Sequence, residues 1–130
     1  MLKLKYLIIT IAVLFFFNSV KGQTSDCLKF KHGKFKMIYN GKLLIIKRDA
    51  NHQYEYYDNA TVPTSYDIKW ISNCSYTLKP ETNNFKKFPN TPQNALITVN
   101  IISYSGNTYK IKATSNFSPL ILKSEITKIN

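Results

Sequence analysis

The chain has 130 residues, with 18 Lys or Arg against seven Asp or Glu, so its formal net charge at pH 7 is +11. This length fits one domain of ordinary size. Four glycines leave no phosphate-cradling loop, and two histidines with no partner at zinc spacing leave no predicted metal site.

Residues 1–22 have the pattern of a signal peptide. Two lysines precede the apolar run Tyr6–Phe17, and Val20 and Gly22 have the small-residue spacing of a cleavage site. As a helix the run would span about 18 Å, short of the ~30 Å hydrocarbon core of a bilayer, which disfavours a membrane anchor. We expect export to the periplasm, the outer-membrane surface or the extracellular space. Residues 23–130 would then form a single domain with net charge +8 and no further transmembrane segment.

Cys27 and Cys74 are the only cysteines, and in an exported chain they are expected to form one disulfide. Closing this loop would stabilise the fold by about 4 kcal/mol on the chain-entropy model. The alternative is a reactive thiol. It is disfavoured because no neighbouring residue supplies the base that a thiolate nucleophile needs.

The first predicted strands lie on either side of Asn40-Gly41, a pair typical of a type I′ β-hairpin turn. A two-residue turn pairs Met37 with Leu44 and Phe35 with Ile46. These four side chains would share one face, which we predict to be the core.

A second turn leads into a strand that contains Gln53, Glu55 and Tyr57. If Arg48 pairs with Gln53, then Ile46 pairs with Glu55, and all three polar residues face the core. Such a group is either an internally satisfied ion pair or a set of ligand contacts. Together with Tyr57, these residues are the candidate ligand-binding site.

The segment 66–78 alternates between apolar and polar residues, as a half-buried antiparallel sheet requires. Trp70, Cys74 and Tyr76 share the apolar face and should form one core cluster. Two arrangements keep them together. One is a hairpin with a three-residue turn over 71–73 that pairs Trp70 with Cys74, and the other is a single bent strand.

The remainder predicts an irregular, proline-containing loop over 79–94 and further strands within 95–104, 108–113 and 119–129. Seven or eight strands joined mostly by short turns favour an all-β antiparallel meander that closes into a small lipocalin-like barrel. A two-sheet sandwich is the alternative.

Three segments, "FKHGKFKMI", "IIKRDANHQYEYY" and "IKWISNCSYTL", carry a family resemblance over about half of the expected mature chain. They resemble a group of small exported proteins of the Bacteroidetes that share a K-W-x-S-[DN]-C-x-Y-x-L segment. The resemblance implies no established function. Some members bear a topoisomerase label, which a chain without an ATP site or a toprim-like acidic cluster does not support. The matching residues are Cys27, Phe30, Lys31, Gly33, Phe35, Arg48, Gln53, Glu55, Lys69, Trp70, Ser72, Asn73, Cys74, Tyr76 and Leu78.

Catalytic patterns are not found. His32 and His52 stand beside turn signals without a nucleophile, and the acids are scattered along the chain. We therefore expect no enzymatic activity, no catalytic residues, no cofactor and no metal.

Lysines alternate with Phe30 and Phe35, which suggests nucleic-acid binding, but strand alternation explains the pattern and Arg48 is the only arginine. No specific nucleic acid is expected. The leading hypothesis is an exported, non-catalytic barrel that binds a small apolar or amphipathic ligand. The alternative is a structural or surface-interaction protein whose lysine-rich face binds an anionic polymer of the cell envelope.

Overall fold

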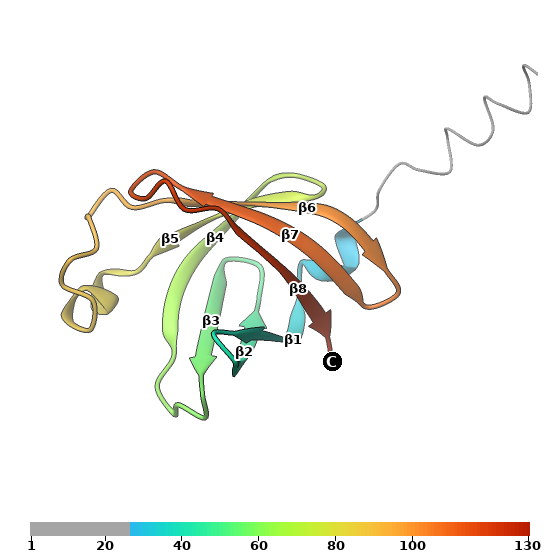
Figure 1. Ribbon diagram of the computed structural model, residues 1–130, viewed down its shortest axis with the longest axis horizontal. Coiled ribbons are helices and arrows are strands. Elements are labelled where there is room, and N and C mark those ends of the chain that lie inside the picture. Colours follow the sequence, from blue (N-terminus) through green and yellow to red (C-terminus); the bar gives the residue numbers. More distant parts are fainter. Residues whose placement is uncertain (1–26) are drawn as a thin grey trace, which may run out of the picture.

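The computed structural model describes residues 27–130, so the predicted signal peptide lies outside the described residues. The fold is a closed antiparallel barrel in which every strand pairs with the next and the last pairs with the first (Figure 1). The predicted all-β meander barrel is confirmed. Its elements are η1 (Leu28–Phe30), β1 (Gly33–Tyr39), β2 (Lys42–Arg48), β3 (His52–Tyr57), β4 (Thr64–Ser72), β5 (Ser75–Pro80), η2 (Thr82–Lys86), β6 (Ile97–Ser105), β7 (Thr108–Ser115) and β8 (Leu122–Lys128).

The β1–β2 hairpin has the predicted turn and register. Asn40 and Gly41 both have positive φ, 51° and 75°, as a type I′ turn requires. Cross-strand pairing brings Phe35 opposite Ile46, and both are fully buried. The alternation of side chains along these strands therefore defines the inner face of the barrel.

The β2–β3 pairing also has the predicted register, with Ile46 opposite Glu55 and Arg48 opposite Gln53. The turn length on which that inference depended is therefore correct. As a result three polar side chains point inward, and two of them, Arg48 and Gln53, are almost fully buried.

The β4–β5 region is a hairpin, so of the two predicted arrangements the single bent strand is wrong, and the pairing of Trp70 with Cys74 expected for the hairpin is wrong as well. Trp70 pairs with Tyr76, and Ser72 pairs with Ser75, with a register shift between Trp70 and Ser72. The turn has two residues, Asn73 and Cys74, instead of the predicted three. Such a turn alone would direct Trp70 and Tyr76 to opposite faces, and the register shift returns them to the same face. Trp70 and Tyr76 still share the core, with ring centroids 4.7 Å apart.

A short plug, η1, covers one end of the barrel, and the sequence did not predict this helix. Cys27 is fully buried and forms the predicted disulfide with Cys74. Phe30 is also fully buried, and its ring lies 4.5 Å from that of Tyr109 in β7. The disulfide therefore ties the plug to the β4–β5 turn.

The barrel closes between β1 and β8, and this seam is short. Only two ladder pairs join the strands, Phe35 with Lys128 and Lys36 with Thr127. Gly33 begins β1 at φ +125°, and a Cβ there would collide with the backbone oxygen of Asn130. The closure therefore depends on a glycine at this position. No helix in the described part of the chain is long and apolar enough to cross a membrane.

Candidate functional site: the barrel cavity

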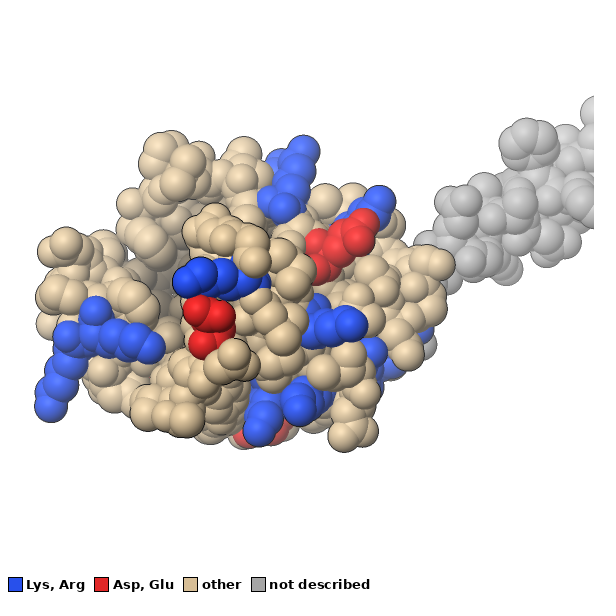
Figure 2. Space-filling model, turned by 60° about the horizontal axis from the view of Figure 1, so that its bottom comes forward, with Lys and Arg blue, Asp and Glu red and all other residues tan. Residues whose placement is uncertain are grey.

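The barrel interior holds a cavity of about 580 Å³ that opens to the surface. Its walls are mainly apolar and come from strands all round the barrel. Figure 2 shows a face of the molecule that is visibly hollowed, with lysines spread around rather than gathered in one patch. The apolar wall includes Met37, Leu44, Leu78, Val99, Ile111 and Ile126.

Arg48 lies between the cavity and the η1 plug and is not among the residues that line the cavity. Its Nη1 donates to the backbone oxygen of Phe30 at 2.6 Å and to the hydroxyl of Tyr109 at 3.3 Å. Its Nη2 donates to the hydroxyl of Tyr76 at 3.1 Å, and its Nε donates to Oε1 of Gln53 at 2.9 Å. The guanidinium is thus held by four oxygens that come from four different parts of the chain.

Aromatic rings complete the surroundings of this guanidinium. Its central carbon lies 4.6 Å from the ring centroid of Phe35 and 4.8 Å from that of Tyr76, distances at which cation–π attraction is appreciable. Burial opposes the charge, but the oxygens of Tyr76 and Tyr109 outweigh it and raise the pKa of Arg48. Burial also raises the pKa of Tyr76, which stays a neutral hydrogen-bond partner. The network closes the floor of the cavity.

Gln53 connects this floor to the cavity. Its amide oxygen accepts from Arg48, and its Nε2 donates to Oε2 of Glu55 at 2.8 Å. Arg48 can only donate, so it fixes the orientation of the amide, with the oxygen toward Arg48 and the nitrogen toward Glu55. No direct ion pair joins Arg48 to Glu55 in the described chain. The predicted internal ion pair is therefore a relay through Gln53.

Glu55 lines the cavity with its carboxyl group. Burial raises the pKa of Glu55, and neither the hydrogen bond from Gln53 nor the charge of Arg48 fully offsets it. A carboxyl in this setting can donate a hydrogen bond when protonated, or accept from a donor or a cation when ionised. It is the one acidic group among the lining residues.

The opposite end of the cavity, away from η1, is lined by aromatic side chains. Tyr57 lies there and forms an edge-to-face contact with Tyr39, with ring centroids 5.6 Å apart. Tyr66 also lines the cavity, and burial raises its pKa. Lys87 and Phe88 reach the same cavity from the long loop that follows η2, at the end opposite the plug (Figure 1).

Three of the four predicted ligand-binding residues therefore line one cavity, namely Gln53, Glu55 and Tyr57. Arg48 does not line it but donates a hydrogen bond to Gln53, which does. Sequence reasoning missed Tyr39 and Tyr66, although inward parity in their strands could have indicated both. It also missed Lys87 and Phe88, since an irregular loop has no periodicity from which side-chain direction can be inferred.

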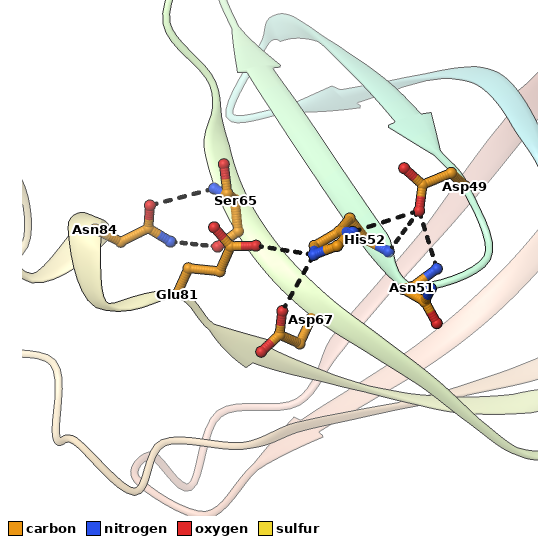
Figure 3. Close-up of polar contacts among 7 residues, drawn as sticks. All are labelled: Asp49, Asn51, His52, Ser65, Asp67, Glu81 and Asn84. Atoms are coloured by element: carbon orange, nitrogen blue, oxygen red, sulfur yellow. Dashed lines mark hydrogen bonds and ion pairs between the residues drawn. The ribbon is translucent and has the colours of Figure 1, made fainter.

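A second polar cluster lies outside the barrel around His52 (Figure 3). Nε2 of His52 is 3.7 Å from Oδ1 of Asp67 and 3.6 Å from Oε1 of Glu81, and its Nδ1 is 3.6 Å from Oδ1 of Asp49. Backbone N–H groups of Asn51 and His52 donate to that Asp49 oxygen and lower the pKa of its carboxyl. His52, Asp67 and Glu81 are the residues that could hold a metal ion. The sequence-based expectation of no metal site took no account of this grouping.

Comparison of the chain with family models, with curated proteins and with solved structures found no match.

Proposed function

We propose that the barrel binds one small apolar or amphipathic ligand in its interior. The observation that carries the proposal is the cavity of about 580 Å³ with mainly apolar walls. This volume lies within the range of roughly 300–1,000 Å³ typical of small-molecule sites. A small barrel can equally well be filled by its own side chains, so the space left in this one favours a ligand.

The polar groups suggest how such a ligand would be oriented. An apolar body would contact the aliphatic wall, and a hydroxyl, amide or amine would meet the carboxyl of Glu55. Gln53 holds that carboxyl from one side and leaves its other oxygen for the ligand. Tyr57 and Tyr66 add aromatic surface on which a cationic or flat group could pack.

The direct test is native mass spectrometry of the protein purified from the organism that encodes it. A discrete extra mass that survives high salt and is lost on unfolding is the expected result, and its composition would identify the ligand. A bare chain would favour the alternative role, interaction of the basic surface with an anionic envelope polymer.

A matched pair of variants tests the location. Ala113 is buried and lines the cavity, so Ala113→Phe would fill part of it. Lys112 precedes it on the outer face of β7, and Lys112→Phe adds the same ring outside. The anilinonaphthalene sulfonate dye should bind the original protein saturably, and only Ala113→Phe should weaken its binding. Equal dye binding by both variants would argue against an interior site.

A further inference from the structure

The outer wall of the barrel brings together a histidine and two carboxylates from three consecutive segments. His52 starts β3, Asp67 stands directly opposite it in β4, and Glu81 follows β5 by one residue. One nitrogen or oxygen atom from each lies within 4.8 Å of the others (Figure 3). Gln53, the next residue after His52, faces inward, so this cluster and the cavity occupy opposite faces of the same wall.

The cluster around His52 has an excess of negative charge that a cation would balance. In a chain with 18 basic and seven acidic residues, exposed acids have many lysines to pair with. Asp58 and Glu125 do so, with Lys42 and Lys110. In the described chain no ion pair joins a lysine to the three acids that surround His52, which are Asp49, Asp67 and Glu81.

Nε2 of His52 therefore faces two carboxylate oxygens, from Asp67 and Glu81. A nitrogen lone pair directed at two anionic oxygens is repulsive, so a positive charge belongs between them. A proton on Nε2 supplies one unit of charge and a divalent metal ion supplies two. Lys79 stands in register with Asp67 across β4 and β5, yet forms no ion pair with it.

Asp49 lies on the other side of the imidazole ring from Asp67 and Glu81. Its Oδ1 is 3.6 Å from Nδ1, so with a metal ion on Nε2 it would be placed to accept from the N–H at Nδ1. Metal-binding histidines usually have a carboxylate or carbonyl in this outer position. The backbone N–H groups of Asn51 and His52 hold that oxygen in place at 2.9 and 2.8 Å.

Glu81 is positioned by its own backbone contacts. Its N–H donates to the oxygen of Ser65 at 3.0 Å, and its carbonyl accepts from the N–H of Asn84. The side chain of Asn84, itself buried, accepts from the N–H of Ser65 and donates to its oxygen. This bracket fixes the start of η2 against β4, so Glu81 is held beside Asp67 rather than carried on a free loop.

The two nitrogen–oxygen distances are close to those around a tetrahedral ion. With bonds of about 2.0–2.1 Å to nitrogen and 2.0–2.2 Å to oxygen, two ligand atoms of a tetrahedral Zn²⁺ lie roughly 3.3 Å apart. The observed nitrogen–oxygen separations of 3.7 and 3.6 Å exceed this by a few tenths of an ångström. Rotations of the exposed Asp67 and partly exposed Glu81 side chains would close this difference and bring the two carboxylate oxygens, which lie within 4.8 Å of each other, to the same ion.

We propose that His52, Asp67 and Glu81 bind one divalent transition-metal ion, with Zn²⁺ as its representative, on the outer wall of the barrel. The imidazole favours Zn²⁺ over Mg²⁺ or Ca²⁺, which prefer all-oxygen sites. Three protein ligands leave a fourth position for water.

The test uses the disulfide-bonded mature protein, freed of metal by a chelator and titrated with Zn²⁺ by calorimetry and with Co²⁺ by visible absorption. We expect one saturable site per chain, with a shift of the His52 Nε2 resonance in NMR spectra. His52→Gln should abolish binding, and Asp67→Asn and Glu81→Gln should each weaken it. Asp49→Asn, which changes only the outer carboxylate, should weaken it by about 10-fold.

Matched variants separate this site from other causes. Glu125→Gln removes a carboxylate that pairs with a lysine, and His32→Gln removes the other histidine; neither should change Zn²⁺ affinity. Ala113→Phe should also leave it unchanged, because the cavity lies on the inner face. Circular dichroism would establish that each variant is folded. Absence of binding at millimolar Zn²⁺, or binding retained by a folded His52→Gln variant, would overturn the proposal.

Discussion

Replacing Arg48 by Met should severely destabilise the barrel, because one side chain supplies the donors for the whole floor of the cavity. Its guanidinium donates to Gln53, to the backbone of Phe30 and to the hydroxyls of Tyr76 and Tyr109. Arg48 is only 5% exposed, so water has little access to replace what is lost. Methionine keeps most of the aliphatic stem and removes every donor.

The magnitude of the loss follows from the buried hydrogen-bond acceptors that would be left without a donor. A buried acceptor without a donor costs about 1–3 kcal/mol. The two tyrosine hydroxyls can relax by rotating, whereas the Phe30 carbonyl is fixed in η1 and cannot. Cation–π contacts with Phe35 and Tyr76 are lost as well. Relief of the buried charge offsets part of this, and we expect a net loss of about 3–5 kcal/mol, comparable to breaking a buried ionic network.

Urea denaturation followed by tryptophan fluorescence would measure this loss in the free energy of unfolding, since Trp70 packs against Tyr76, one of the hydroxyl partners of Arg48. For a slope of about 1.5 kcal/mol/M, the midpoint should fall by about 2–3 M. The control is Lys112→Met, the same replacement on the outer face, which should change stability by less than about 0.5 kcal/mol. A midpoint for Arg48→Met within about 0.5 M of the original would refute the assignment of Arg48 as the organiser of the floor.

Three further predictions concern the cavity carboxyl, the seam and the disulfide. Burial raises the pKa of Glu55, so its contribution to the free energy of unfolding is intact below the unfolded-state pKa of about 4.3 and is lost as pH rises through the higher folded-state value. Glu55→Gln should therefore lose less stability than the original protein between about pH 4 and neutral pH in parallel urea titrations, and identical pH profiles would contradict this. Gly33→Ala should cost more than Gly106→Ala in the same assay, because both glycines have positive φ but only Gly33 has backbone where the new methyl group would lie; equal losses would show that the close approach is unimportant. Removing the disulfide with Cys27→Ser and Cys74→Ser together should cost about 4 kcal/mol on the chain-entropy model, and mass spectrometry should show the intact protein two hydrogens lighter than its reduced form.

Local signals in the sequence accounted for much of the barrel. Asn40-Gly41 determined one hairpin and its register. The inward direction of Gln53 and Glu55 depended on a second condition, the pairing of Arg48 with Gln53 across the next turn, and the structure has that pairing. The Trp70–Tyr76 pairing was missed because an irregularity of one residue leaves no mark on an alternating pattern. The short η1 helix was missed for a related reason, since three residues are too few for a helical period.

Contacts between residues far apart in the sequence were not predictable from it. Arg48 was recognised as inward-facing, but its partners Phe30, Tyr76 and Tyr109 belong to three other elements. The same holds for His52, whose neighbour Glu81 is brought to it by two intervening hairpin connections. Strand parity predicts which way a side chain points, and only the closed sheet determines what it meets there.

The short seam between β1 and β8 has a consequence for the order of folding. Seven of the eight strand pairings join neighbours in the chain, so they can form as local hairpins at little loop-closure cost. The remaining pairing joins the first and last strands across the whole domain, and it has two ladder pairs, extended by backbone hydrogen bonds between Lys34 and residues 129 and 130. Closure should therefore be the late, slow step of folding. A chain still being synthesised would hold an open sheet, with its cavity unformed, until its last few residues arrive.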